Sequence, residues 1–214
     1  MKGNLRISGG RKLISPKGEG TRPTTSIVRE ALINLLNTKL LGCNWLDLFS
    51  GSGAMGCEAL MHGAIKVVAV EKNRKIAAIC ETNLRNVSSS ISNKNEVKVI
   101  YGDVLSLLKK GPESLTPKQI SSSELSRFDL VYLDPPYESN LYSFVLQNLL
   151  NKQWLTKNSL VICEHSSIFL PKVPADWEEI DRRNYGKTSL LFLSPLKRYL
   201  CDTGSMQPQT GPKS

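Results

Sequence analysis

The fold of this chain is decided by residues 44–56, which read NWLDLFSGSGAMG. The apolar segment that ends at Phe49 predicts a buried strand, and a helix is expected from about Ala54. Between them, Gly51 permits a sharp turn, and Gly53 leaves no side chain where a ligand approaches the backbone. Nicotinamide-binding enzymes and unrelated strand-to-helix turns share this glycine pattern, so it predicts the fold and not the ligand.

The segments that follow extend this unit into a larger sheet. Apolar runs predict further strands at residues 66–71, 97–101, 128–133 and 160–164, with helices at about 74–86 and 141–150. Strands that alternate with helices imply right-handed crossovers and a parallel sheet. Residues 177–181 and 189–193 predict a closing pair, and the short return between them favours antiparallel pairing. We therefore predict an α/β fold with a Rossmann-like, seven-stranded, mostly parallel sheet and an antiparallel final strand.

An extension precedes this sheet. Residues 5–7 and 12–14 alternate around two glycines, which indicates a small hairpin. A helix follows, with Thr24 or Thr25 as its cap and apolar residues at helical spacing as far as Leu40.

We expect one domain over residues 1–200, in which the extension covers 1–40 and the Rossmann-like core covers 41–200. The polar residues 201–214 are expected to form a disordered tail. Residues 110–126 are rich in serine and predict a surface loop or an insertion.

Composition limits the class of protein. The 214 residues, of which 40% are hydrophobic, suffice for one sizeable core. No apolar stretch is long enough to cross a bilayer, and no secretory core follows the basic N-terminus, so we expect a cytoplasmic protein. The five cysteines are scattered without a Cys-x-x-Cys pair, so neither a metal site nor a disulfide framework is expected. The net charge of +9 favours a polyanionic partner such as nucleic acid, although such a charge also serves solubility alone.

Carboxylates follow three successive predicted strands, at the edge where open α/β sheets bind ligands. Asp47 can orient the glycine turn or reach a cofactor's amino group through water. Glu71 has the spacing of a carboxylate that accepts two ribose hydroxyls, and Asp103 can accept an adenine amino group. A single acid of this kind is usually a solvated loop residue, but three in succession weaken that interpretation. Phe49 and Thr25 complete the candidate cofactor contacts.

A second motif, Asp134-Pro135-Pro136-Tyr137, follows the predicted strand 128–133. The Asp134 carboxylate and the Pro135 carbonyl can each accept a hydrogen bond from an exocyclic amine, whose lone pair is otherwise delocalised into its base. Pro135 and Pro136 have a fixed φ and no N–H, so they preorganise these acceptors. Tyr137 offers a face on which a base can stack, worth roughly 1–3 kcal/mol in other single-strand binders. The simpler interpretation is a turn, because Asp-Pro-Pro is a good turn sequence.

Together the two motifs favour one chemistry. A nicotinamide cofactor would explain the glycine turn and the ribose acid, but not the Asp-Pro-Pro-Tyr loop. Methyl transfer from S-adenosylmethionine to an amino nitrogen explains both motifs. In-line attack on a sulfonium methyl needs mainly proximity and alignment, and it needs no metal.

The order and wording of these motifs resemble the RsmD family of bacterial 16S rRNA (guanine-N2) methyltransferases, over nearly the whole chain to about Leu200. The most specific element is Arg22-Pro23-Thr24-Thr25 followed by residues 28–32, which is similar to the family's entry helix. Residues 46–53, the Asp-Pro-Pro-Tyr loop and the turn at 185–188 are also similar to the family pattern.

The resemblance implies a class I methyltransferase that uses S-adenosylmethionine. It implies as target the N2 atom of a guanine in 16S rRNA (guanine 966 in the family), on the rRNA or on an assembling small subunit. A monomer is our working expectation. The serine-rich residues 110–126 and the tail look longer than is usual for the family, which leaves open the RNA contacts of that edge.

Basic residues near the N-terminus would form a phosphate-binding rim beside the site. They are Arg6, Arg11, Lys12, Lys17 and Arg22. For any one of them a solvated surface charge is the simpler interpretation, and Arg22 can instead order the start of the helix. The target base must be unpaired or flipped out to reach the loop.

Other functions remain open. Adenine-N6 methyltransferases of DNA or RNA use the same loop, although no separate target-recognition domain is visible here. Protein-glutamine methyltransferases generally resemble an Asn-Pro-Pro-Tyr pattern instead. A non-catalytic RNA-binding protein would have no need of intact motifs. Glu164 and His165 follow the predicted fifth strand, where they either line the base pocket or serve packing.

Overall fold

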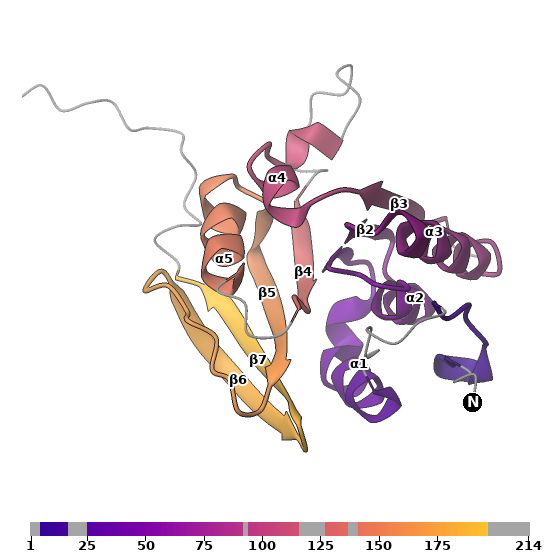
Figure 1. The fold of residues 1–214 in the computed structure, drawn as a ribbon, viewed down its shortest axis with the longest axis horizontal. Helices are drawn as coiled ribbons and strands as arrows, with labels where there is room; N and C mark the ends of the chain where they lie inside the picture. Colours follow the sequence, from indigo (N-terminus) through magenta and orange to yellow (C-terminus); the bar gives the residue numbers. More distant parts are fainter. Residues whose placement is uncertain (1–4, 17–24, 92–93, 116–126, 137–140, 197–214) are drawn as a thin grey trace, which may run out of the picture.

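A seven-stranded sheet forms the centre of the computed structural model, which describes residues 5–16, 25–91, 94–115, 127–136 and 141–196. Its strand order is β3-β2-β1-β4-β5-β7-β6 (Figure 1). The strands are β1 (Asn44–Leu48), β2 (Lys66–Glu71), β3 (Glu96–Tyr101), β4 (Phe128–Leu133), β5 (Leu155–Ser166), β6 (Trp177–Tyr185) and β7 (Thr188–Pro195). Strands β1 to β5 pair with one another in parallel, and β7, which lies between β5 and β6, is antiparallel to both. The predicted sheet is therefore confirmed.

Helices cover both faces of the sheet, because residues along each strand alternate between its two sides. Trp45 belongs to the core on one side and Leu46 to the core on the other. The first core includes α1 (Ser26–Leu40), α2 (Ala54–Met61) and α3 (Arg74–Ser88), and the second includes α4 (Val104–Leu108) and α5 (Leu141–Asn151) (Figure 1).

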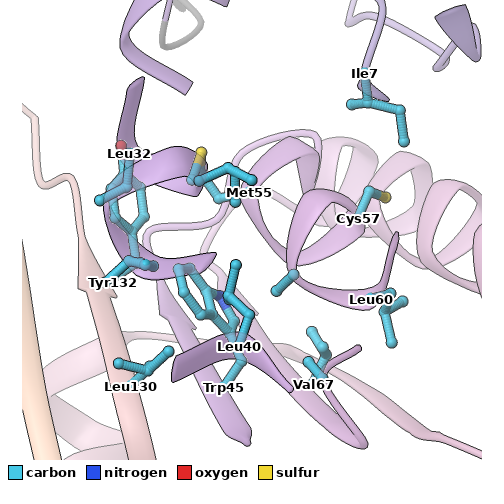
Figure 2. Packing of buried hydrophobic residues seen from close by; sticks show 14 of the residues in the cluster. Ile7, Leu32, Leu40, Trp45, Met55, Cys57, Leu60, Val67, Leu130 and Tyr132 are labelled. Carbon is cyan, nitrogen blue, oxygen red and sulfur yellow. The ribbon is translucent and has the colours of Figure 1, made fainter. Parts of the chain in front are cut away.

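Trp45 anchors the core on the α1 side. Its ring is fully buried and stacks on Tyr132 of β4, with the ring centroids 6.1 Å apart. Figure 2 shows Leu40 of α1 in the same packed group. Asp47 and Asp134 each follow one of these rings by two residues and therefore lie toward the same face. The packing of two large rings thus fixes where both acids emerge.

Residues 5–14 form a reduced version of the predicted hairpin. Arg6 and Lys12 make one isolated antiparallel bridge, and a short 3₁₀ turn, η1 (Ser8–Gly10), joins the two arms. Ile7 is buried in the core that also holds Cys57 of α2, as Figure 2 shows. The described part of the extension therefore packs on the helix layer and adds no strand to the sheet.

Three elements depart from the sequence-based expectations. The helix α4 was not anticipated, and a 3₁₀ turn, η2 (Pro112–Leu115), occupies the start of the expected serine-rich loop. The strand β5 also begins at Leu155, earlier than the predicted residue 160. Residues 116–126 and the expected tail lie outside the described residues.

The described residues bear on two further predictions, that no segment crosses a membrane and that the cysteines form no disulfide framework. Within the described part of the chain, no helix combines the length and apolar character that crossing a bilayer requires. The described cysteines are all buried and unpaired: Cys43, Cys57, Cys80 and Cys163. Burial raises the pKa of each of these thiols, to about 12 for Cys43 and Cys80.

Candidate active site

The topology of the sheet brings the two sequence motifs together. Strand β1 lies between β2 and β4, so the glycine turn after β1 is flanked by the acid that ends β2 and by the loop that follows β4. The backbone N–H of Asp134 donates to the carbonyl of Leu48 at 3.4 Å, and that of Ser50 donates to the carbonyl of Val70 at 3.0 Å. Both bonds lie at the carboxyl ends of the parallel strands, where α/β sheets bind ligands.

The glycine turn adopts left-handed backbone conformations at three positions. Phe49 has φ 62°, Gly51 has φ 53° and Gly53 has φ 78°. For Phe49, which has a Cβ, this conformation costs on the order of 1 kcal/mol, and such strain gathers at functional sites.

Gly51 and Gly53 differ in the space that surrounds their Cα atoms. A Cβ built on Gly53 would lie 2.7 Å from the Sγ atom of Cys80, so packing against α3 excludes a side chain there. A Cβ on Gly51 would meet no atom within 4 Å. The Cβ side of Gly51 is therefore open, and ligand approach to the backbone at Gly53 stays a prediction.

Glu71 holds the turn through both of its carboxylate oxygens. Its Oε2 accepts the backbone N–H of Gly51 at 3.0 Å, and its Oε1 accepts that of Asn73 at 2.7 Å. Because each carboxylate oxygen has two lone pairs, these bonds leave capacity for two further donors. An open glycine backbone beside such an acid fits an adenosine ribose, as S-adenosylmethionine would require.

Asp47 lies beneath the turn. It is almost fully buried, and its Oδ2 accepts the backbone N–H of Gly56, in the first turn of α2, at 3.1 Å. Burial raises the pKa of Asp47 to about 7, against the lowering effect of the Gly56 bond, and the charge of Glu71 raises it further. This geometry corresponds to the first of the two expected roles, orientation of the turn.

Asp103 and Thr25 are helix caps in this structure. Asp103 Oδ1 accepts the backbone N–H of Ser106 at 2.9 Å at the start of α4, and this bond lowers the pKa of the acid. Thr25 Oγ1 accepts the N–H of Val28 at 3.3 Å at the start of α1. Both side chains therefore have a structural partner, and their contact with a cofactor stays a prediction.

The second motif follows β4 directly. Asp134 is half-buried, Pro135 is buried and Pro136 is exposed, whereas Tyr137 lies outside the described residues. Burial raises the pKa of Asp134 well above its usual range, and the negative charges of Glu164 and Asp47 add to this effect. The acid therefore lies among other carboxylates in a poorly solvated position, which is typical of a functional group.

A small pocket opens beside Asp134. Its lining residues are Asp134, Pro135, Tyr142, Glu164, His165, Ser166, Phe169 and Thr188. The hydroxyl of Tyr132 donates to the Glu164 carboxylate, and that of Tyr142 donates to the Glu164 carbonyl at 2.6 Å. Glu164 and His165 line this pocket and are both buried, and its role as a base pocket stays a prediction.

Asn83 connects the extension to the glycine turn, a role that the sequence did not reveal. It is 2% exposed, and its amide nitrogen donates to the carbonyls of Ile14 and Ser52, both at 2.9 Å. Its oxygen accepts the N–H of Ile14 at 2.9 Å. A polar residue on an amphipathic helix normally predicts a solvated face, so only its position next to Cys80 and Leu84 could have indicated burial.

A buried ion pair docks the other arm of the extension. Arg29 Nε lies 3.4 Å from Glu58 Oε1, and each side chain is 4% exposed. The N–H of Ser8 also donates to the Glu58 carboxylate, and Arg29 donates to the carbonyl of Arg6. The segment that most resembled a family signature thus joins α1, α2 and the N-terminal residues.

The expected basic rim is only partly described. Arg6 donates to the carbonyl of Gly10 at 2.9 Å, and Arg11 donates to the carbonyl of Asn86 at 3.3 Å, near the end of α3. Lys12 is exposed. Lys17 and Arg22 lie outside the described residues, so the rim stays a prediction. Among described residues, no cluster of His, Cys, Asp or Glu side chains has the arrangement of a metal site.

Comparison with known proteins agrees with this arrangement. The chain is 33% identical over 181 residues to ribosomal RNA small subunit methyltransferase D of Escherichia coli K12, covering 82% of each chain. It is 32% identical over 192 residues to the protein of the same name from Haemophilus influenzae, covering 88% of this chain and 92% of the relative.

Solved structures show the same architecture. The candidate methyltransferase yhhF of Escherichia coli superposes with a TM-score of 0.72 at 29% identity, covering 89% of this chain and 97% of the other. The rRNA methyltransferase aviRa of Streptomyces viridochromogenes has a TM-score of 0.63 and covers 88% and 90%, and at 16% identity this likeness shows the fold alone. The family model described as conserved hypothetical protein 95 matches residues 5–194. The chain therefore belongs to this family, the RsmD family that its motifs resemble.

Proposed function

We propose that this protein transfers a methyl group from S-adenosylmethionine to the exocyclic N2 of a guanine in 16S rRNA, with guanine 966 or its equivalent as the site. The observation that carries the proposal is the adjacency of the glycine turn after β1 and the Asp134 loop after β4. The relatives named ribosomal RNA small subunit methyltransferase D support the substrate class.

The cofactor half of the site is Gly51 with Glu71. The carboxylate of Glu71 would accept the ribose hydroxyls while it holds the turn, and the open backbone at Gly51 would allow the cofactor to approach. Asp103, Phe49 and Thr25 would complete the cofactor contacts. When bound, S-adenosylmethionine supplies an electrophilic methyl group on its sulfonium.

The acceptor half is Asp134 with the carbonyl of Pro135. Two hydrogen bonds from the amine to these acceptors would direct its lone pair toward the methyl group. Asp134 must be ionised to accept, and a nearby positive charge lowers the pKa of a carboxyl group. After transfer the amine carries an extra proton, and Asp134 is placed to receive it. Tyr137 would supply a stacking face for the base.

The net charge and the acceptor loop support a nucleic-acid partner. The net charge of +9 suits a phosphate backbone, with Arg6, Arg11, Lys12, Lys17 and Arg22 as the proposed contacts. The guanine must be unpaired or flipped out of its stack to reach the Asp134 loop. We place the reaction in the cytoplasm, on 16S rRNA or an assembling small subunit, with the protein acting as a monomer.

Methyl transfer from labelled S-adenosylmethionine tests the proposal. The substrates are small ribosomal subunits and free 16S rRNA that lack the modification, and the product is digested to nucleosides. Label in N2-methylguanosine supports the proposal. Label in N6-methyladenosine would instead make the protein an adenine-N6 methyltransferase, and cofactor binding without label in either substrate would contradict both assignments.

A further inference from the structure

The pocket beside Asp134 contains a histidine nitrogen that no part of the methyl-transfer proposal uses. His165 is 6% exposed and lines the pocket with Asp134 and Pro135. Its Nε2 atom is buried and has no hydrogen-bond partner among the described residues. A buried polar atom without a partner costs free energy, so such an atom in a pocket indicates a ligand that completes it.

The other ring nitrogen fixes what Nε2 can do. His165 Nδ1 lies 2.8 Å from the backbone carbonyl of Ser166. A carbonyl oxygen only accepts, so Nδ1 carries the proton in this pair. In the neutral ring Nε2 is then unprotonated and is a hydrogen-bond acceptor.

The register of the sheet places this acceptor beside the catalytic loop. Leu133 of β4 pairs with Cys163 of β5 in a parallel ladder. Two positions further along each strand, Pro135 and His165 therefore lie at the same level on neighbouring segments. His165 therefore lies beside the backbone of the catalytic loop, and it lines the pocket together with Asp134 and Pro135.

We infer that His165 determines base specificity by accepting a hydrogen bond from the N1–H of the target guanine, an inference that rests on the proposed function. Guanine carries its N1–H next to the N2 amine, so His165 Nε2 would accept the N1–H while the Asp134 carboxylate and the Pro135 carbonyl accept from the amine. Adenine presents an unprotonated N1 beside its N6 amine, and two acceptors would then face each other. With adenine bound, the buried Nε2 would have no hydrogen-bond donor. Binding sites discriminate strongly against a ligand that leaves a buried polar group of the site unpaired in this way.

Activity on two different bases at the methylated position distinguishes a role of His165 in base recognition from a role in packing alone. Small subunits are reconstituted around 16S rRNA that carries either guanine or 2-aminopurine there. The analogue keeps the 2-amino group but has no hydrogen on N1. We expect wild-type protein to prefer guanine in kcat/KM. The variant His165→Ala should lower kcat/KM for guanine about tenfold to a hundredfold while leaving the analogue nearly unchanged, so that the preference collapses.

Two further variants complete the test. His165→Gln keeps an acceptor oxygen and should restore part of the guanine preference. His62→Ala removes the other histidine, at the end of α2, and should leave the preference at the wild-type value. The affinity for S-adenosylmethionine should be equal in all four proteins. A guanine preference that survives in His165→Ala overturns the inference alone, whereas a wild-type protein without activity on guanine overturns the proposed function with it.

Discussion

The carboxylate of Glu71 accepts a hydrogen bond from the backbone N–H of Gly51 at 3.0 Å, which ties the acid at the end of β2 to the turn after β1. A second bond, from Asn73 at 2.7 Å, orients the same carboxylate. Glu71 is thus held by the backbone that it is expected to help present to the cofactor. A glutamine at this position would keep the shape of the Glu71 side chain and remove its negative charge.

Glu71→Gln should weaken the binding of S-adenosylmethionine at least tenfold, equivalent to about 1.4 kcal/mol. A carboxamide has only one acceptor oxygen, so one of the two backbone N–H groups would face an NH₂ group. Isothermal titration calorimetry measures the change in Kd. Glu81→Gln, at an exposed ion pair on α3, is the matched control and should leave Kd unaltered. An unchanged Kd for Glu71→Gln would remove Glu71 from the cofactor site.

Asn83→Leu should loosen both the extension and the glycine turn. The substitution preserves approximate volume but removes the side-chain partners of the partly buried backbone groups of Ile14 and Ser52, at a cost of about 0.5–1.5 kcal/mol for each lost bond. Hydrogen exchange should accelerate at residues 5–16 and 50–54, with little change in β5 and β7. Equal exchange in variant and wild type would show that Asn83 does not couple these segments.

Asp47→Asn should change how stability depends on pH. The folded state binds the Asp47 proton more tightly than the unfolded state, because the pKa is about 7 when folded and 3.8 for the free side chain. Wild-type stability should therefore fall as the pH rises from about 4 to about 7, by a few kcal/mol at most. Asparagine still accepts the N–H of Gly56 and does not ionise, so the variant should lose this slope and be the more stable protein at pH 8. Urea unfolding measures the free energy of unfolding of both proteins across this pH range. If the wild type and the variant depend on pH in the same way, Asp47 is not the cause of the slope.

Glu164→Gln should shift the acidic limb of the pH–rate profile. The reaction needs ionised Asp134, whose pKa is raised by burial and by the charge of Glu164. Wild-type kcat/KM for RNA should therefore rise with pH through a value well above that of an ordinary carboxyl group. Removing the Glu164 charge lowers the pKa of Asp134, so the limb should move to lower pH. The exposed Glu178→Gln on β6 serves as the control, and an unmoved limb in Glu164→Gln would exclude this electrostatic link.

Much of the fold could be predicted because its signals are local. The apolar strand ending at Leu48, the turn glycines and the closing strands each follow from neighbouring residues, and the sheet agrees with them. The helix α4 was missed because five residues carry too little periodicity to distinguish a helix from a loop.

Parts of the site that depend on contacts between residues far apart in the sequence were harder to predict. The packing requirement at Gly53 comes from Cys80, and the partner of Ile14 is Asn83. The buried pair of Arg29 and Glu58 reads in sequence as two surface charges. No spacing rule connects these residues, since their proximity arises only after the helices pack on the sheet.

The most direct test of the central claim is a comparison of Asp134→Asn with Asp129→Asn in methyl transfer to small subunits. Asp129 lies on the same strand at its opposite end, where it accepts hydrogen bonds from Asn44 and Thr156. We expect Asp129→Asn to form N2-methylguanosine at close to the wild-type rate. Asp134→Asn should bind S-adenosylmethionine normally yet lose transfer at least a hundredfold, on the order of 3 kcal/mol of transition-state stabilisation. Wild-type activity in Asp134→Asn would contradict the assignment of this loop as the catalytic centre.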